Sequence, residues 1–93
     1  MKYKIYDAKK LRDALEKMSG NDFAEAEKQA RMEGDKSVDI MVSRTFFAVL
    51  AAKAFKVPFT DIQNLPIREY CVITGDVGSF LLTPDQEETP EKV

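Results

Sequence analysis

The chain has 93 residues, of which 44% are hydrophobic, so it is long enough for one small domain with a single core. It carries 14 basic and 16 acidic residues, and residues 84–93 hold four of the acids but only one base. This near balance, without a basic stripe, argues against nucleic-acid binding. No apolar run approaches the roughly 18 residues needed to cross a bilayer, so we expect no membrane partner.

The first 18 residues begin with a short polar–apolar alternation, Lys2–Tyr6, which is compatible with a β-strand or hairpin arm. Asp7 can cap a following helix, and Leu11, Leu15 and Met18 then lie on one helical face. The alternative is a second strand, with Leu11, Asp13 and Leu15 alternating, paired with residues 2–6. Helix propensity favours the helix.

A break at residues 19–22 precedes the second expected helix, for which Asn21 or Asp22 is the predicted cap. Gly34 is expected at the C′ position that ends it. The helix is expected to lie on the domain surface because its apolar stripe is narrow and rich in alanine. That stripe consists of Phe23, Ala26, Ala30 and Met32.

The third expected helix runs from Val38 to Phe55, with Ser37 as its cap. It is hydrophobic over most of its circumference, which predicts a central position in the fold. Its predicted stripes are Val42, Phe46 and Val49 on one side, and Phe47, Leu50, Ala51 and Ala54 on another.

Val57-Pro58 ends this helix, and Thr60 and Gln63 have the spacing of a capping box around a short turn, 61–64. The last helix is expected over 66–82, with Pro66 at its first position and Pro84 as its stop. Its apolar residues are Ile67, Tyr70, Cys71, Ile73, Val77, Phe80 and Leu81. Gly75 and Gly78 within it indicate a close backbone approach or a kink.

No catalytic or metal-binding constellation is recognisable. Histidine is absent, which removes the commonest general base and most transition-metal sites. Asp35 and Asp39 flank a loop, but a calcium site requires more oxygen ligands. We expect no cofactor and no enzymatic activity. The single cysteine, Cys71, cannot form an internal disulfide, which suits a reducing, cytoplasmic compartment. We expect it to be a buried structural thiol.

Three residues are candidate partner anchors. Phe59 follows Pro58 in an expected loop and would be an anchor if exposed, and Phe80 and Leu82 end the last helix. The apolar faces of the helices expected over 38–55 and 66–82 are wider than one small core hides. Self-association or partner binding would cover the excess. We therefore expect one mainly α domain over residues 1–83 and a disordered acidic tail over 84–93.

Residues 11–82 resemble the tail assembly chaperones of long-tailed bacteriophages and prophages. The resemblance rests on the segment Ser-Gly-Asn-Asp-Phe-x-Glu-Ala-Glu at 19–27, on Phe47 with Ala-Lys-Ala-Phe at 52–55, on Val57-Pro58 and Leu65-Pro66, and on Val-Gly-Ser-Phe-Leu-Leu at 77–82. It implies a mostly helical, non-enzymatic protein of the host-cell cytoplasm, absent from the finished virion. It further implies binding to the tape-measure protein, help in bringing tail-tube protein to it, and often a second form made by ribosomal frameshifting. In relatives, the part aligned with 11–18 often reads as a strand.

Two other functions remain open from the residues alone. A small helical DNA-binding regulator also joins two helices by a turn, although the linker from Lys56 to Leu65 is long and the last helix carries only Arg68 as a base. An enzyme subunit that uses carboxylates would require a cleft with a strongly raised carboxyl pKa.

Overall fold

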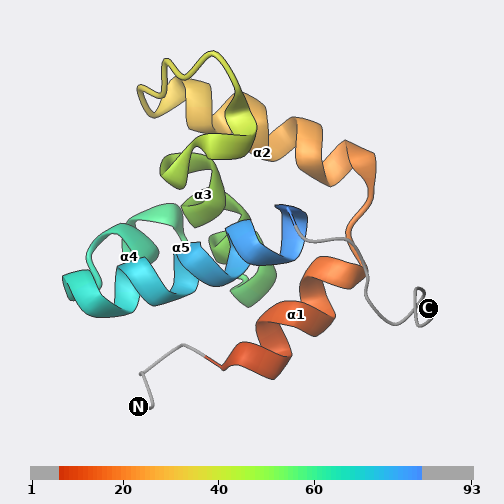
Figure 1. Cartoon of the computed structure of the whole chain (residues 1–93), viewed down its shortest axis with the longest axis vertical. Helices are drawn as coiled ribbons and strands as arrows, with labels where there is room; N and C mark the ends of the chain where they lie inside the picture. The colour runs from red at the N-terminus through yellow and green to blue at the C-terminus, as the bar shows by residue number, and fades with distance from the viewer. Residues whose placement is uncertain (1–6, 83–93) are drawn as a thin grey trace, which may run out of the picture.

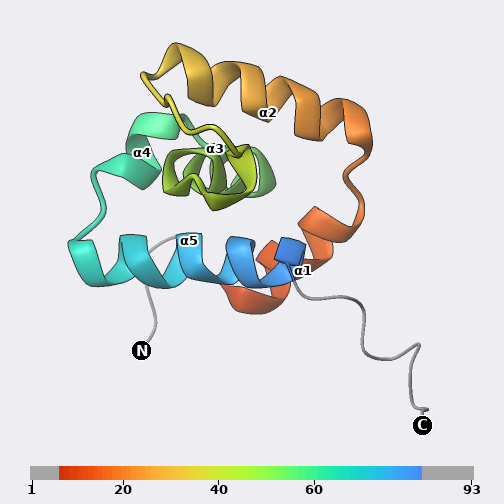
Figure 2. The same ribbon diagram turned by 45° about the horizontal axis from the view of Figure 1, so that its top comes forward.

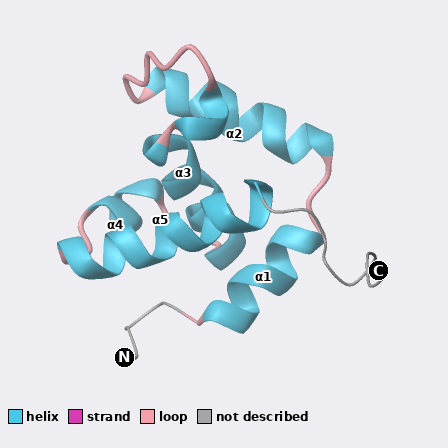
Figure 3. Cartoon of the chain, viewed as in Figure 1, coloured by secondary structure: helices cyan, strands magenta, loops and turns pink. Residues whose placement is uncertain are grey.

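The computed structural model describes residues 7–82, and this part of the chain consists of helices joined by loops, with no strand (Figure 3). The elements are α1 (Ala8–Glu16), α2 (Gly20–Met32), the short 3-10 helix η1 (Ile40–Val42), α3 (Arg44–Phe55), α4 (Phe59–Gln63) and α5 (Ile67–Leu82). The mainly α class is confirmed. The predicted strand at 2–6, the stop at Pro84 and the acidic tail lie outside the described residues.

Helix α3 occupies the centre and packs against α1, α2, α4 and α5 (Figure 1). Figure 2 looks nearly along α3 and shows α2 and α5 on opposite sides of it. Nine of its twelve residues are buried, which confirms the central position predicted from its all-round hydrophobicity. These residues are Phe46, Phe47, Ala48, Val49, Leu50, Ala51, Ala52, Ala54 and Phe55.

The predicted start of α3 is wrong by six residues. Ser43, not Ser37, is the N-cap, and its hydroxyl accepts a hydrogen bond from the Phe46 amide at 3.1 Å. The preceding residues form η1, which Asp39 caps through the Met41 amide. Val42, predicted on a core stripe, is 69% exposed, because it belongs to η1 and not to α3.

Helix α1 confirms the helical interpretation over residues 8–16 and excludes the alternative strand in which Leu11, Asp13 and Leu15 alternate. The Asp7 carboxylate caps it by accepting hydrogen bonds from the amides of Lys9 and Lys10. Leu11 and Leu15 are 2% and 6% exposed. Leucines four residues apart share one helical face, and in this helix that face is buried against the core.

Helix α2 starts and ends on local signals. Its N-cap is Ser19, which forms a reciprocal capping box with Asp22. The predicted cap, Asn21 or Asp22, is therefore wrong. At the other end Gly34 has a φ of +107°, and the amides of Gly34 and Asp35 bond the carbonyls of Arg31 and Ala30. This is the C′ glycine that the sequence predicted.

The apolar stripe of α2 is confirmed for its first three members and wrong for the fourth. Ala26 and Ala30 are almost fully buried, and the Phe23 ring packs edge-on against Phe46 with ring centroids 4.8 Å apart. Met32 is 78% exposed, because it lies off the line formed by the other three.

The connection from α3 to α5 is a tight turn followed by a short helix. Lys56 adopts the left-handed conformation at φ +60°, and Pro58 precedes α4. No side chain caps α4, so the predicted capping box of Thr60 and Gln63 is absent. Burial of Phe59 and Ile62, 7% and 0% exposed, holds this short helix on the core.

Helix α5 approaches α3 closely at Gly78. A Cβ placed on Gly78 would lie 2.8 Å from Cε2 of the Phe47 ring, whereas one on Gly75 would meet nothing within 4 Å. Of the two predicted alternatives, a close approach or a kink, the close approach is confirmed at Gly78, and Gly75 makes no such approach. Ile73 and Val77 of α5 are fully buried beside this contact.

A second contact between these helices is polar. Thr74 is fully buried, and its hydroxyl donates a hydrogen bond to the Tyr70 carbonyl at 2.7 Å. The same oxygen accepts one from Nη1 of Arg44, in the first turn of α3, at 2.6 Å. This pair fixes the start of α3 against the first half of α5.

Candidate protein-docking surfaces

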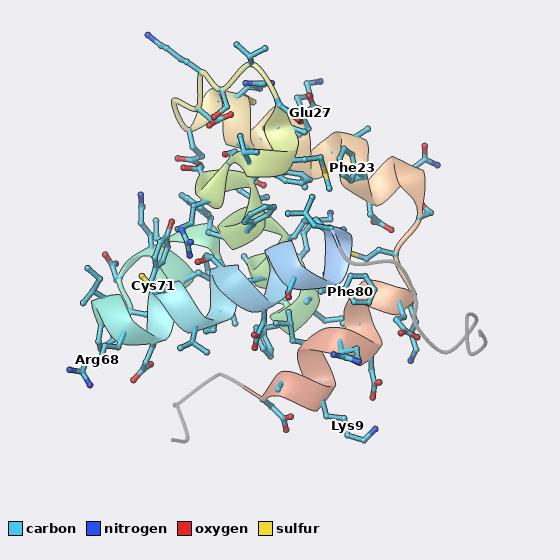
Figure 4. All side chains as sticks on the ribbon, viewed as in Figure 1. Lys9, Phe23, Glu27, Arg68, Cys71 and Phe80 are labelled. Carbon is cyan, nitrogen blue, oxygen red and sulfur yellow. The ribbon has the colours of Figure 1, made fainter. Side chains whose placement is uncertain are left out.

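The outward face of α5 is the first candidate surface. Eight residues of this helix are exposed, and only Arg68 and Asp76 among them are charged. The others are Ile67, Cys71, Val72, Gly75, Ser79 and Leu82. We call these eight residues the α5 outer face. Figure 4 labels Arg68 and Cys71 near the first turns of the helix, and Phe80 near its end.

The three predicted anchors have different surroundings. Phe59, expected in a loop, is the first residue of α4 and is buried in the core, so the condition for its role as an anchor is not met. Phe80 is half-buried and packs against the core, close to the end of α1 in Figure 4. Leu82 is 59% exposed and belongs to the α5 outer face.

Cys71 corrects another expectation. It is exposed, not a buried structural thiol, because the side of α5 turned to α3 is occupied by Ile73, Thr74 and Val77. Ile67, also expected on the inner face, is 77% exposed. Apolar residues thus lie on both sides of α5, but only the side that faces α3 is buried in the protein.

The loop between α2 and α3 is the second candidate surface. Val38 and Val42 within it, and Met32 just before it, are 102%, 69% and 78% exposed. Beneath them Asp35, whose side chain is 8% exposed, holds the loop in place. Its carboxylate accepts hydrogen bonds from the hydroxyls of Ser37 and Ser43, both at 2.8 Å, and from Nη1 of Arg31 at 3.0 Å.

Electrostatics in this loop favour the ionised carboxylate. Burial by itself raises the pKa of Asp35, but the hydrogen bonds from Ser43 and Ser37 and the charge of Arg31 outweigh it, so the pKa lies below its usual value. The opposite holds on α5, where burial raises the pKa of Asp76. Burial also raises the pKa of Tyr70, against the opposing charge of Arg44.

An open groove of about 660 Å³ between α1 and the end of α3 is the third candidate surface. Its apolar lining is Ala14, Met18 and Ala54. Its charged lining carries a net formal charge of +2, from Lys9, Lys10, Lys17, Lys53 and Lys56 against Asp7, Asp13 and Asp22. We call it the lysine groove.

Within residues 7–82, no group of three or more acidic or cysteine side chains is placed to hold a metal ion. Asp35 and Asp39, considered as cation ligands, instead accept hydrogen bonds from hydroxyls, Arg31 and the Met41 amide. None of the described helices is both long and apolar enough to span a bilayer. Comparison with known protein families, with curated protein sequences and with solved structures found no match.

Sequence reasoning missed the lysine groove and the loop surface. The groove combines residues of α1 with Lys53, Ala54 and Lys56, which come together only through packing. For α5 the sequence carried part of the signal, since few residues of this helix are charged, but packing on α3 decides which side is exposed.

Proposed function

We propose that this chain is a non-enzymatic phage tail assembly chaperone that binds the tape-measure protein through the α5 outer face. In this role it keeps the tape-measure protein soluble in the host-cell cytoplasm and assists assembly of the tail tube. It is not retained in the finished virion. The family resemblance supplies the identity of the partners, and the structure supplies a surface suited to them.

The composition of the α5 outer face is the observation that carries the proposal. On α1, five of the six exposed residues are charged, namely Lys9, Lys10, Arg12, Asp13 and Glu16. On α5, only two of the eight exposed residues are charged, namely Arg68 and Asp76. A solvent-facing helix surface with so little charge is typical of an interaction site.

The shape of this face suits a helical partner. Ile67 and Leu82 lie fifteen residues apart, so the face extends over roughly 22 Å, about four helical turns. Cys71, Gly75 and Ser79 lie four residues apart and are small, which lets a second helix approach closely, while the larger apolar residues flank them. An amphipathic helix binds such a surface through residues spaced three and four apart.

Co-expression with the tape-measure protein of the same phage or prophage tests the proposal. We expect the tape-measure protein to stay soluble and to co-elute with the chain on gel filtration. The variant I67E/L82E places two charges on the α5 outer face and should abolish both effects. The matched control Q29E/Q63E places the same charges at exposed glutamines of α2 and α4, outside all three candidate surfaces, and should leave both unchanged.

Circular dichroism separates loss of binding from loss of folding. All four substituted residues are exposed, and surface substitutions usually change the free energy of unfolding by less than about 0.5 kcal/mol. Equal solubility of the tape-measure protein with and without the chain contradicts the proposed function. Equal binding by I67E/L82E and by the control contradicts the assignment to α5 while leaving the function intact.

A further inference from the structure

The lysine groove carries more positive charge than its own residues neutralise. Lys9 pairs with Asp13 at 3.2 Å, and Lys53 pairs with Glu25 at 3.2 Å. Lys10, Lys17 and Lys56 make no ion pair with any residue of the described part of the chain. Three lysines around an apolar floor of Ala14, Met18 and Ala54 form a surface for an acidic ligand.

The end of α5 lies close to this groove. Both Figure 1 and Figure 2 show the last turn of α5 beside the end of α1, and the two helices are in contact. Met18, which follows α1, lines the groove. The last turn of α5 therefore lies beside the end of α1, where Lys17 and Met18 line the groove.

The sequence that follows Leu82 is complementary in charge and sufficient in length. Residues 83–93 contain the acids Asp85, Glu87, Glu88 and Glu91 and a single base, Lys92. An extended chain spans up to roughly 3.3 Å per residue, so nine residues from Leu82 to Glu91 reach about 30 Å. The groove runs along α1 and its flanking residues from Asp7 to Met18, a length of only about 17 Å.

We propose that the acidic segment Asp85–Glu91 of this chain binds in its own lysine groove, through ion pairs to Lys10, Lys17 and Lys56. Tethering favours this occupant over a free acidic ligand, since a short linker gives an effective concentration in the millimolar range. The segment shields the groove from other acidic ligands. This interaction lies apart from the α5 outer face and does not depend on the proposed function.

NMR chemical shifts of the full-length chain test the proposal. The variant K10Q/K17Q/K56Q should move the amide signals of residues 85–91 to the positions they have in an isolated peptide of residues 83–93. The reciprocal variant D85N/E87Q/E88Q/E91Q should shift amides that line the groove and leave those around Ile67 unchanged. As a matched control, E27Q/E33Q neutralises one acid on α2 and one at its C-cap, and should leave both sets of signals in place.

Salt and protein concentration distinguish the alternatives. Raising the salt from about 0.01 M to about 1 M shortens the Debye length from roughly 30 Å to roughly 3 Å, and should reproduce the shifts of the lysine variant. Signals of residues 85–91 that are the same in the wild-type chain and the lysine variant overturn the proposal. Shifts that depend on protein concentration also overturn it, because the occupant is then the tail of a second copy.

Discussion

Replacement of Gly78 by alanine tests the close packing of α5 on α3. The new Cβ would lie 2.8 Å from Cε2 of Phe47 and 3.2 Å from its Cζ, a distance that forces the ring or the helix to move. The ring is 7% exposed and has little room. Overpacking a core costs about 1–3 kcal/mol, against a gain of about 0.8–1.0 kcal/mol in helix propensity. We expect a net loss of roughly 0–2 kcal/mol.

Gly75→Ala is the matched control on the same helix. A Cβ there meets nothing within 4 Å, so only the propensity gain remains, and we expect stabilisation of about 1 kcal/mol. The difference between the two variants isolates the contact with Phe47. Urea denaturation followed by circular dichroism measures it, since a change of 1 kcal/mol moves the midpoint by about 0.3–1 M.

A double-mutant cycle identifies the contact partner. Phe47→Leu removes the ring atoms nearest Gly78, so F47L/G78A should be more stable than the sum of the single effects implies. Neighbours in direct contact show coupling of about 0.5–3 kcal/mol. If Gly78→Ala stabilises the protein as much as Gly75→Ala, the packing described for α3 and α5 is wrong.

Three further predictions concern caps and buried hydrogen bonds. Ser19→Ala should lower the free energy of unfolding by about 1 kcal/mol and Asn21→Ala by less than about 0.5 kcal/mol, as measured by urea denaturation, because Ser19 is the cap of α2; equal losses would mean that Ser19 is not the cap. The lowered pKa of Asp35 stabilises the fold above the usual carboxyl pKa of 3.8, and this contribution is lost as the pH falls through the lower pKa of the folded state. The pH dependence of stability should therefore be shallower in Asp35→Asn over that acid range, and identical slopes would contradict the hydrogen bonding described for Asp35. Thr74→Val should destabilise the protein by about 1 kcal/mol in thermal unfolding, because it removes a buried hydroxyl that accepts a hydrogen bond from a guanidinium; an unchanged Tm would show that this bond contributes nothing.

Elements with local signals were predictable from the sequence. Asp7 and two leucines four residues apart define α1, and Gly34 marks the end of α2. The all-round hydrophobicity of 46–55 placed α3 at the centre. In each case the information lies within a few neighbouring residues, so the pattern is sufficient.

The start of α3 was not predictable in the same way. Val38 and Val42 continue the apolar pattern toward the N-terminus, and Ser37 is also a good cap. In the structure the Asp35 carboxylate bonds the hydroxyls of both Ser37 and Ser43, and Ser43 then caps the helix. A network that spans eight residues of loop therefore decides the boundary.

The candidate surfaces depend on tertiary packing. Helix α5 is apolar on both sides, so its sequence alone does not show which side α3 covers. Gly78 decides this, since the close approach of Phe47 places Val77 inside and Cys71 outside. The prediction that Phe59 lies in a loop is wrong for a related reason, because its burial depends on the packing of α4 against the core.

The central claim is that the α5 outer face binds the tape-measure protein, and Cys71 offers the most direct test. It is exposed on that face, and it is the single cysteine of the chain, so its rate of modification by a thiol reagent reports on this surface alone. We expect the rate to fall sharply in the purified complex and to return to the free value when the complex is dissociated. An unchanged rate in an intact complex would contradict the claim.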